Sequence, residues 1–356
     1  MPIIDSDTHV IESERTWEFM EEHEQGFKPL VVVPKSGGPA ERTTGFSGAR
    51  NFVINEFWII EGRAKQKRSS FKSVEVTDEQ AEMQDIEARL AHMDELGVDV
   101  HVLYPTIFLS PLTRRPEVEV ALYRSYNRWM SEIHDRGGDR LRWAAMLPYM
   151  SIDKSIEEMH WAKDHGACSI FMHSIEGERR LSDPYFDPIY REAAQLDLPA
   201  CIHATSGNFQ LFDVYATDAG FSTFKLPVVG AFHDLLMKGT PAKHPDLRWG
   251  FVEVSAEWVP YALNDMMLRF NKGGRPWQGR EILKENNMYV ACQTADDLDW
   301  VLDSVGDDNI VIGSDYGHND TSSEILALTN LRENGKVPKS SADKILEANA
   351  RRLYAL

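Results

Sequence analysis

The sequence predicts a (β/α)8 TIM barrel, and three observations support this fold class. The chain has 356 residues, which is enough for one large barrel domain. Short apolar runs alternate with helical patterns, which is typical of a parallel sheet covered by helices. Eight such runs occur, although a doubly wound open sheet has the same periodicity and remains an alternative. The runs cover residues 3–7, 98–104, 141–149, 168–173, 199–205, 248–254, 288–293 and 309–315.

The first run ends in Asp7 and His9, two side chains that bind metal ions. Residues two apart in a strand point to the same face, so both side chains could ligate one ion. The simpler alternative is that Asp7 caps a turn and His9 bonds to the backbone.

Residues 13–76 interrupt the alternation and read as an insertion after the first strand. The segment is rich in proline and glycine, with one apolar strand-like run at 52–60 and a basic cluster at 63–72. Loops that follow barrel strands lie on the catalytic face. We therefore predict one domain, 1–356, in which 13–76 is a lid or an oligomerisation segment; a surface excursion without either role is the alternative.

The helix before the second strand carries clear boundary signals. Thr77 and Gln80 predict a capping box, an apolar stripe covers 83–96, and Gly97 supplies the stop.

An aromatic group follows the fifth run and includes Phe209 and Phe212. Aromatic side chains on the catalytic face could form the wall of an apolar substrate pocket, so both are candidate substrate-binding residues. The alternative is that these aromatic side chains only pack beneath a loop.

Ionisable side chains concentrate where the predicted strands end, which is where barrel enzymes keep their chemistry. Each of them singly could be a satisfied core histidine or a helix cap. Together they would place several like charges at one barrel mouth, and a divalent cation would compensate them. The residues are Asp7, His9, His173, His203, Glu253 and Asp315.

Composition excludes several classes of partner. Charged residues make up 26% and hydrophobic residues 42% of the chain, as in ordinary globular proteins. The formal net charge of −18 argues against nucleic acid or an anionic membrane, because either requires a basic surface. Without a secretory signal or a bilayer-spanning stretch, a cytoplasmic location is predicted. Three cysteines in apolar runs are expected to be free core thiols.

Several motifs together resemble the amidohydrolase superfamily, and more narrowly the amidohydrolase-related group that includes amino-carboxymuconate-semialdehyde decarboxylase and the resorcylate decarboxylases. The likeness covers nearly the whole chain outside the insertion. The motifs are Asp-Thr-His at 7–9, Leu-Pro-Ala-Cys-Ile-His at 198–203, His-Pro-Asp-Leu-Arg-Trp-Gly-Phe-Val-Glu at 244–253, Gly-Ser-Asp-Tyr-Gly-His at 313–318 and Asn-Ala-Arg-Arg-Leu-Tyr at 349–354.

This resemblance implies a metal site. His9, His203 and Asp315 match the family's ligand positions, whereas Asp7 and Glu253 stand where histidines are usual. The extra carboxylates favour iron or manganese over zinc, or two ions instead of one. Asp7 is then a ligand, and Glu253 is either a ligand or an acid–base group.

The resemblance also implies catalytic roles. By this resemblance Asp315 is the expected proton acceptor. His318, just beyond Asp315, either contacts the leaving group or a substrate carboxylate or orients its loop, and His173 is a candidate substrate contact. Hydrolysis of an amide, ester, thioester or vinylogous carbon–carbon bond in a small organic acid or aromatic substrate is favoured.

Decarboxylation of an aromatic or unsaturated acid is the runner-up, for which Arg114, Arg115 and Arg179 are candidate carboxylate contacts. A non-catalytic metal-binding barrel is the alternative of another class. The expected partners are a small-molecule substrate and further copies of the chain, as a homodimer or a larger assembly.

Overall fold

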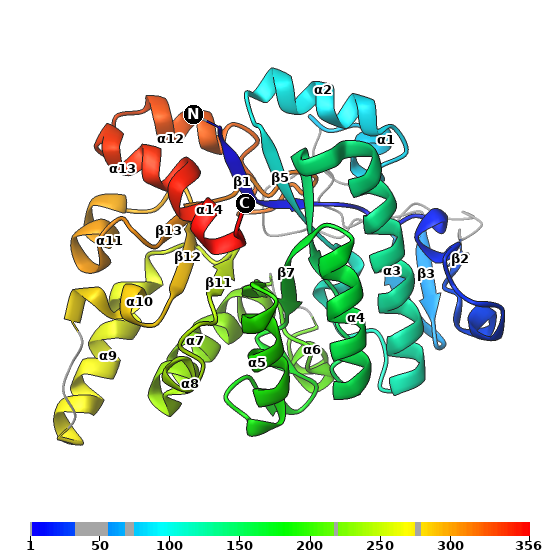
Figure 1. Cartoon of the computed structure of the whole chain (residues 1–356), viewed down its shortest axis with the longest axis horizontal. Coiled ribbons are helices and arrows are strands. Elements are labelled where there is room, and N and C mark those ends of the chain that lie inside the picture. The colour runs from blue at the N-terminus through cyan, green and yellow to red at the C-terminus, as the bar shows by residue number, and fades with distance from the viewer. Residues whose placement is uncertain (1, 33–55, 68–74, 217–219, 275–278) are drawn as a thin grey trace.

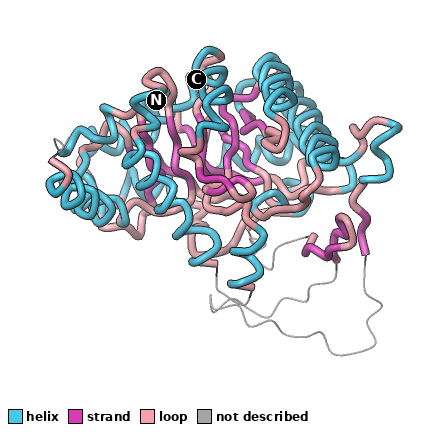
Figure 2. The backbone as a smooth tube through the Cα atoms, turned by 90° about the horizontal axis from the view of Figure 1, so that it is seen from below, coloured by secondary structure: helices cyan, strands magenta, loops and turns pink. Residues whose placement is uncertain are grey.

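The fold is an eight-stranded parallel barrel wrapped by helices (Figures 1 and 2). The computed structural model describes residues 2–32, 56–67, 75–216, 220–274 and 279–356. All eight predicted strands are present, with slightly different bounds. In spatial order they are β1 (Ile4–His9), β5 (Val100–Tyr104), β6 (Leu141–Ala145), β7 (Ala167–Met172), β10 (Ala200–His203), β11 (Trp249–Val252), β12 (Met288–Cys292) and β13 (Ile310–Ile312).

The sheet closes between its first and last strands, which decides against the open sheet. The Asp315 amide donates to the Asp7 carbonyl at 3.0 Å, and the His9 amide donates to the Tyr316 carbonyl at 2.7 Å. Gly313 permits this closure, because a Cβ at that position would lie 2.2 Å from the Cβ of Asp7. The seam of the barrel therefore joins the two segments that carry Asp7, His9 and Asp315.

The longer helices follow the strands around the barrel, and shorter ones lie in the connections. The strands are buried almost throughout, as expected for a parallel sheet covered by helices. The helices are α1 (Asp78–Ala81), α2 (Ile86–Leu96), α3 (Pro116–Gly137), α4 (Ile152–Asp164), α5 (Asp187–Gln195), α6 (Phe209–Val214), α7 (Leu226–Lys238), α8 (Thr240–Lys243), α9 (Trp258–Lys272), α10 (Ile282–Glu285), α11 (Leu298–Val305), α12 (Ala327–Glu333), α13 (Lys339–Asp343) and α14 (Asn349–Tyr354).

The predicted helix from Thr77 to Gly97 is two helices. Thr77 and Gln80 form the expected capping box, but this box starts the short helix α1. The chain then breaks at Met83, which has φ 54°, and α2 begins with Asp85 as its side-chain cap. Gly97 ends α2 in the left-handed conformation, as predicted. The apolar stripe did not predict this break, because the spacing of apolar residues does not indicate that a single residue adopts the left-handed conformation.

The described part of the insertion forms a small antiparallel sheet outside the helical ring (Figures 1 and 2). It consists of β2 (Leu30–Val32), β3 (Phe57–Ile60) and β4 (Arg63–Gln66). Of the predicted run at 52–60, Phe57–Ile60 form a strand, and residues 52–55 lie outside the described ranges. Trp58 is fully buried against Trp17. The roles of lid or oligomer contact remain predictions.

The three cysteines are buried and free, as expected. Among the helices of the described ranges, none combines the length and the apolar character that a membrane span requires.

Candidate metal centre

The carboxyl ends of four strands bring the predicted ligands to one point. Asp7 and His9 lie at the end of β1, His203 is the last residue of β10, Glu253 follows β11, and Asp315 follows β13. All five side chains are at least nine-tenths buried. The parallel sheet places these positions at the same mouth because every strand ends there.

Distances between the side chains fit a bound cation. His9 Nε2 lies 3.4 Å from Oδ1 of both Asp7 and Asp315, and His203 Nε2 lies 3.2 Å from Asp7 Oδ1. Ligand atoms that surround an ion tetrahedrally at about 2.1 Å are separated by roughly 3.4 Å. The atoms are thus spaced like neighbouring ligands of one divalent ion.

The backbone sets the tautomer of His9. Its Nδ1 lies 2.9 Å from the carbonyl oxygen of Pro105, which only accepts, so Nδ1 carries the proton. Nε2 is left with a lone pair directed at Asp7 and Asp315. A histidine held in this way is oriented for metal ligation.

Two buried nitrogens of the site, His9 Nε2 and His203 Nδ1, have no hydrogen-bond partner among the described residues. An unpartnered buried polar atom is costly, so two in one cluster indicate a ligand. The donor set of imidazole nitrogens and carboxylate oxygens suits zinc, iron or manganese.

Seven residues offer ligand atoms in three overlapping groups, and within each group these atoms lie within 4.8 Å of one another. We call these residues the carboxylate–histidine cluster. They are Asp7, His9, His203, Glu253, Asp315, His318 and Asp320.

Two carboxylates of the cluster occupy strained backbone conformations. Asp315 has φ 53° and Glu253 has φ 63°, although neither is glycine. A left-handed residue of this kind costs of order 1–3 kcal/mol and persists when its surroundings impose it. This conformation turns both side chains into the barrel mouth, one residue after β11 for Glu253 and three residues after β13 for Asp315.

Crowded charges shift the pKa values of the cluster. Burial raises the pKa of Asp315 to about 8 and that of Glu253 well above its ordinary value, where Asp315 adds to the effect. Burial and the nearby His318 lower the pKa of His9 to about 3. Burial opposes ionisation of Asp7 too, but His203 and His9 lower its pKa below the usual range. A divalent cation would relieve the repulsion between the carboxylates.

His318 is held as an imidazolium beside Asp315. The Thr106 hydroxyl donates to the Val10 carbonyl, so it accepts from His318 Nε2 at 2.9 Å. His318 Nδ1 lies 2.9 Å from Asp315 Oδ1. Although burial opposes it, the Asp315 charge raises the pKa of His318 to about 9. Because both ring nitrogens face oxygen acceptors, the contacts favour the doubly protonated ring.

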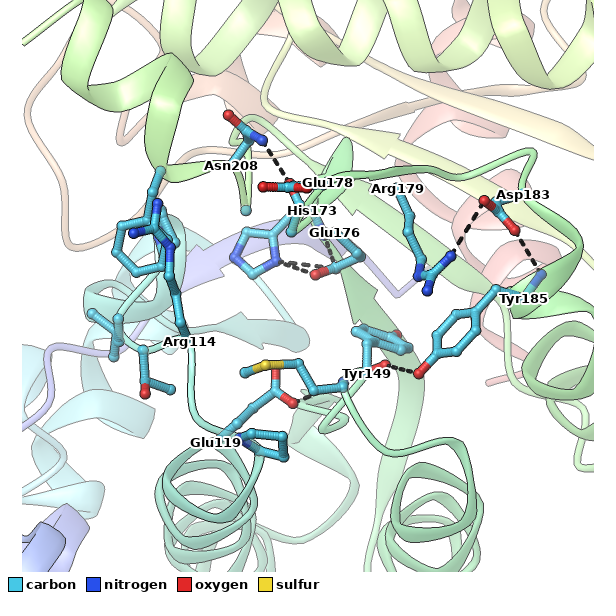
Figure 3. Close-up of a pocket in the computed structure, with 18 of the residues that line it drawn as sticks. Arg114, Glu119, Tyr149, His173, Glu176, Glu178, Arg179, Asp183, Tyr185 and Asn208 are labelled. Carbon is cyan, nitrogen blue, oxygen red and sulfur yellow. Dashed lines mark hydrogen bonds and ion pairs between the residues drawn. The ribbon is translucent and has the colours of Figure 1, made fainter.

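His173 lies outside the cluster. Its Nδ1 pairs with Glu176 at 3.0 Å, and its Nε2 lies 2.8 Å from the Phe108 carbonyl. Glu176 raises the pKa of His173 despite burial. The His173–Glu176 pair lines a cavity of about 610 Å³, with Arg114 and Arg179 on opposite sides of it (Figure 3).

The two aromatic candidates line cavities beyond the cluster. Phe209 lines the larger cavity and a neighbouring one of about 410 Å³, and Phe212 lines the smaller one. Neither ring touches a cluster residue in the contacts that the structure gives. His173, Phe209 and Phe212 remain predicted substrate contacts.

Sequence reasoning missed the residues that support the cluster from the loops. Asp320 joins it through the spacing Asp-x-x-His-x-Asp after β13, a pattern that was visible in the chain. Pro105 and Thr106 orient His9 and His318. The sequence could not predict these contacts, because a backbone carbonyl and a threonine hydroxyl become partners of the histidines only when the loop folds against them.

The amidohydrolase family model matches residues 4–356. The chain therefore belongs to the amidohydrolase family. This result confirms the predicted family and the prediction of an enzyme in place of a non-catalytic barrel.

Solved structures share the fold at low identity. An amidohydrolase from Mycobacterium avium subsp. paratuberculosis has a TM-score of 0.77 at 18% identity, over 100% of this chain and 98% of its own. The 5-carboxyvanillate decarboxylase of Novosphingobium aromaticivorans, complexed with manganese and 4-hydroxy-3-methoxy-5-nitrobenzoic acid, has a TM-score of 0.65 at 21% identity, over 80% and 84%. The 2,6-dihydroxybenzoate decarboxylase from Rhizobium has a TM-score of 0.67 at 16% identity, over 100% and 99%. Among curated proteins, none matches the sequence.

Proposed function

We propose that the protein is a metal-dependent decarboxylase of small aromatic or unsaturated carboxylic acids. The observation that carries the metal site is the spacing of His9 Nε2, 3.4 Å from the carboxylates of Asp7 and Asp315. The structural neighbours that bind aromatic acids support the substrate class.

Asp7, His9, His203 and Asp315 would hold the ion, and manganese is the first metal to test because carboxylates make up half of this set. Bound there, a divalent ion would lower the pKa of water to about 7 and neutralise a substrate carboxylate.

Glu253 and His318 would supply the proton that decarboxylation needs. When the bond between the ring carbon and the carboxylate breaks, carbon dioxide leaves and the electron pair on carbon must take up a proton. Glu253 is 9% exposed, its Oε2 lies 3.3 Å from His203 Nδ1, and its raised pKa favours the protonated form. His318, doubly protonated, is the second donor.

Hydrolysis is the second candidate, and the sequence favoured it. Asp315 supports it, because its carboxylate lies within the cluster and, when ionised, could accept a proton from water. The Ser323 hydroxyl donates to its Oδ2 and orients the carboxylate.

Product analysis separates the two reactions. Manganese-loaded protein would be incubated in D2O with a panel of hydroxybenzoates and, separately, with activated esters and amides. Decarboxylation predicts carbon dioxide and one deuterium at the carbon that lost the carboxylate, detected by NMR. Release of an alcohol or amine without carbon dioxide would replace the proposal with hydrolysis. A Glu253→Gln variant is expected to lose decarboxylation while it keeps its metal content.

A further inference from the structure

Two cavities share Phe209, and no residue of the carboxylate–histidine cluster lines either of them. Residues from the β3–β4 hairpin, the loop after β5 and helix α6 line the smaller cavity. Pro111, Leu112 and Phe209 line both cavities, so the two are adjacent.

Three cations gather around the phenylalanine rings of these cavities. The guanidinium carbons of Arg63 and Arg114 each lie 4.5 Å from the centre of the Phe209 ring. Lys65 Nζ lies 5.6 Å from the Phe212 ring and donates to the Ser110 hydroxyl. We call Arg63, Lys65 and Arg114 with these two rings the basic cavity.

These three cations have no carboxylate partner among the described residues, whereas their neighbours do. Lys67 pairs with Glu14 at 3.0 Å. Arg115, directly after Arg114, pairs with Glu61 at 2.9 Å and with Glu117 at 2.6 Å. The ion pairs of the described residues include none with Arg63, Lys65 or Arg114.

The chain has 56 acidic and 38 basic residues, so carboxylates are in excess over cations. Asp213 also lines the smaller cavity, yet it forms no ion pair with the cations. Burial of Lys65 and the charge of Arg63 lower the pKa of Lys65 to about 8. Like charges held together near apolar rings are stabilised by an anion.

We propose that the basic cavity binds the oxyanion group, carboxylate or phosphate, of a small organic ligand. The guanidinium groups match planar or tetrahedral oxyanions, and the rings offer an apolar surface for the body of the ligand. None of these five residues belongs to the carboxylate–histidine cluster, and binding of an anion to them does not require turnover.

The loop after β5 stands between the two sites. Pro105 and Thr106 contact His9 and His318 of the cluster, whereas Ser110, five residues after Pro105, accepts from Lys65. The two sites therefore share one short loop without sharing a side chain.

Calorimetric titration of the metal-loaded protein with inorganic phosphate and with benzoate tests the site and separates the two sources of the oxyanion. Arg114→Gln is expected to weaken binding of the preferred anion roughly 10-fold or more. Arg115→Gln removes the same charge from the next residue, whose side chain is already paired, and is expected to change affinity less than about 2-fold. Equal effects of the two substitutions, or no binding of either anion to the wild type, would overturn the proposal.

Lysine acetylation followed by mass spectrometry tests the same site without a variant. At pH 8 the preferred anion is expected to protect Lys65 from acetylation at least about 3-fold and to leave the exposed Lys154 unchanged. Equal rates for Lys65 with and without anion would contradict the site. Neither measurement requires turnover, so a failure of the proposed reaction would be seen separately, in the product assay.

Discussion

The carboxylate–histidine cluster and the basic cavity lie next to the same loop but have opposite charge. In the cluster, the carboxylates of Asp7, Glu253 and Asp315 lie close together, and a bound cation would offset their repulsion. In the basic cavity, Arg63, Lys65 and Arg114 lack carboxylate partners among the described residues and call for an anion. The difference shows that a strongly acidic chain does not distribute its charges evenly. We infer that each of these groups of like charges binds a ligand of the opposite sign.

The largest expected effect comes from removing a proposed metal ligand of the cluster. His9→Ala is expected to lower metal affinity roughly 1,000-fold, more than the 10–100-fold that loss of a supporting hydrogen bond costs. Metal analysis after dialysis would measure it. His173→Gln is the matched control, because His173 pairs with Glu176 outside the cluster, and it should keep its metal. Equal metal loss in both variants would contradict the assignment of the cluster, while anion binding in the basic cavity should survive in His9→Ala.

Crowding the barrel seam with an added Cβ tests how closely Gly313 packs against Asp7. Gly313→Ala is expected to destabilise the protein by about 3 kcal/mol, because the new Cβ would meet Asp7 at 2.2 Å. Denaturant unfolding of the metal-free protein would measure the change. Gly230→Ala in α7 has open space around its Cβ and should stabilise the helix by about 0.5–1 kcal/mol. A neutral Gly313→Ala would show that the seam is looser than described.

The two regions should also differ in how pH changes stability. In the folded state burial raises the pKa of Asp315 to about 8, and it raises the pKa of Glu119, a buried residue of α3 outside both regions, to about 8 as well. Between pH 6.5 and 8 the folded state of the metal-free protein thus holds more protons than the unfolded state. Its stability should fall as pH rises, by up to roughly 1.4 kcal/mol per pH unit for each proton.

Lys65 contributes with the opposite sign, since its pKa is lowered to about 8 in the folded state and stability should rise with pH above that value. Urea unfolding at pH 6.5, 7.2 and 8.0 would give the slope. Bound metal should flatten it, because the ion keeps its carboxylate ligands ionised. A metal-free protein that becomes more stable over this range would contradict the raised carboxyl pKa values.

The smallest expected effect is at the loop between the regions. Thr106→Val removes the hydroxyl that accepts from His318 and is expected to cost about 1 kcal/mol of stability. It should also lower the pKa of His318, seen as a shift of its titration by NMR. Thr106→Ser keeps the hydroxyl and should restore both values. If Thr106→Val matches the wild type in both measurements, the loop does not hold His318.

Much of the cluster could be predicted because an acidic or imidazole side chain after an apolar strand is unusual. Asp7, His203 and Asp315 were identified in this way, and the fold brings them together. The same reasoning could not separate His173 from His203, since both stand at the end of a buried strand. What differs is the partner, Glu176 for one and Asp7 for the other. Side-chain partners depend on loop paths that periodicity does not encode.

The sequence by itself determined the eight strands, their order along the chain and the family, because apolar runs and polar strand ends are local patterns. Only the tertiary structure decided that the sheet closes, that Asp320 joins the cluster, and that Arg63 and Arg114 meet at one ring. These contacts join residues far apart in the chain or held by strained loops. Their geometry follows from how the barrel closes and how its loops pack, and no local pattern of residues records it.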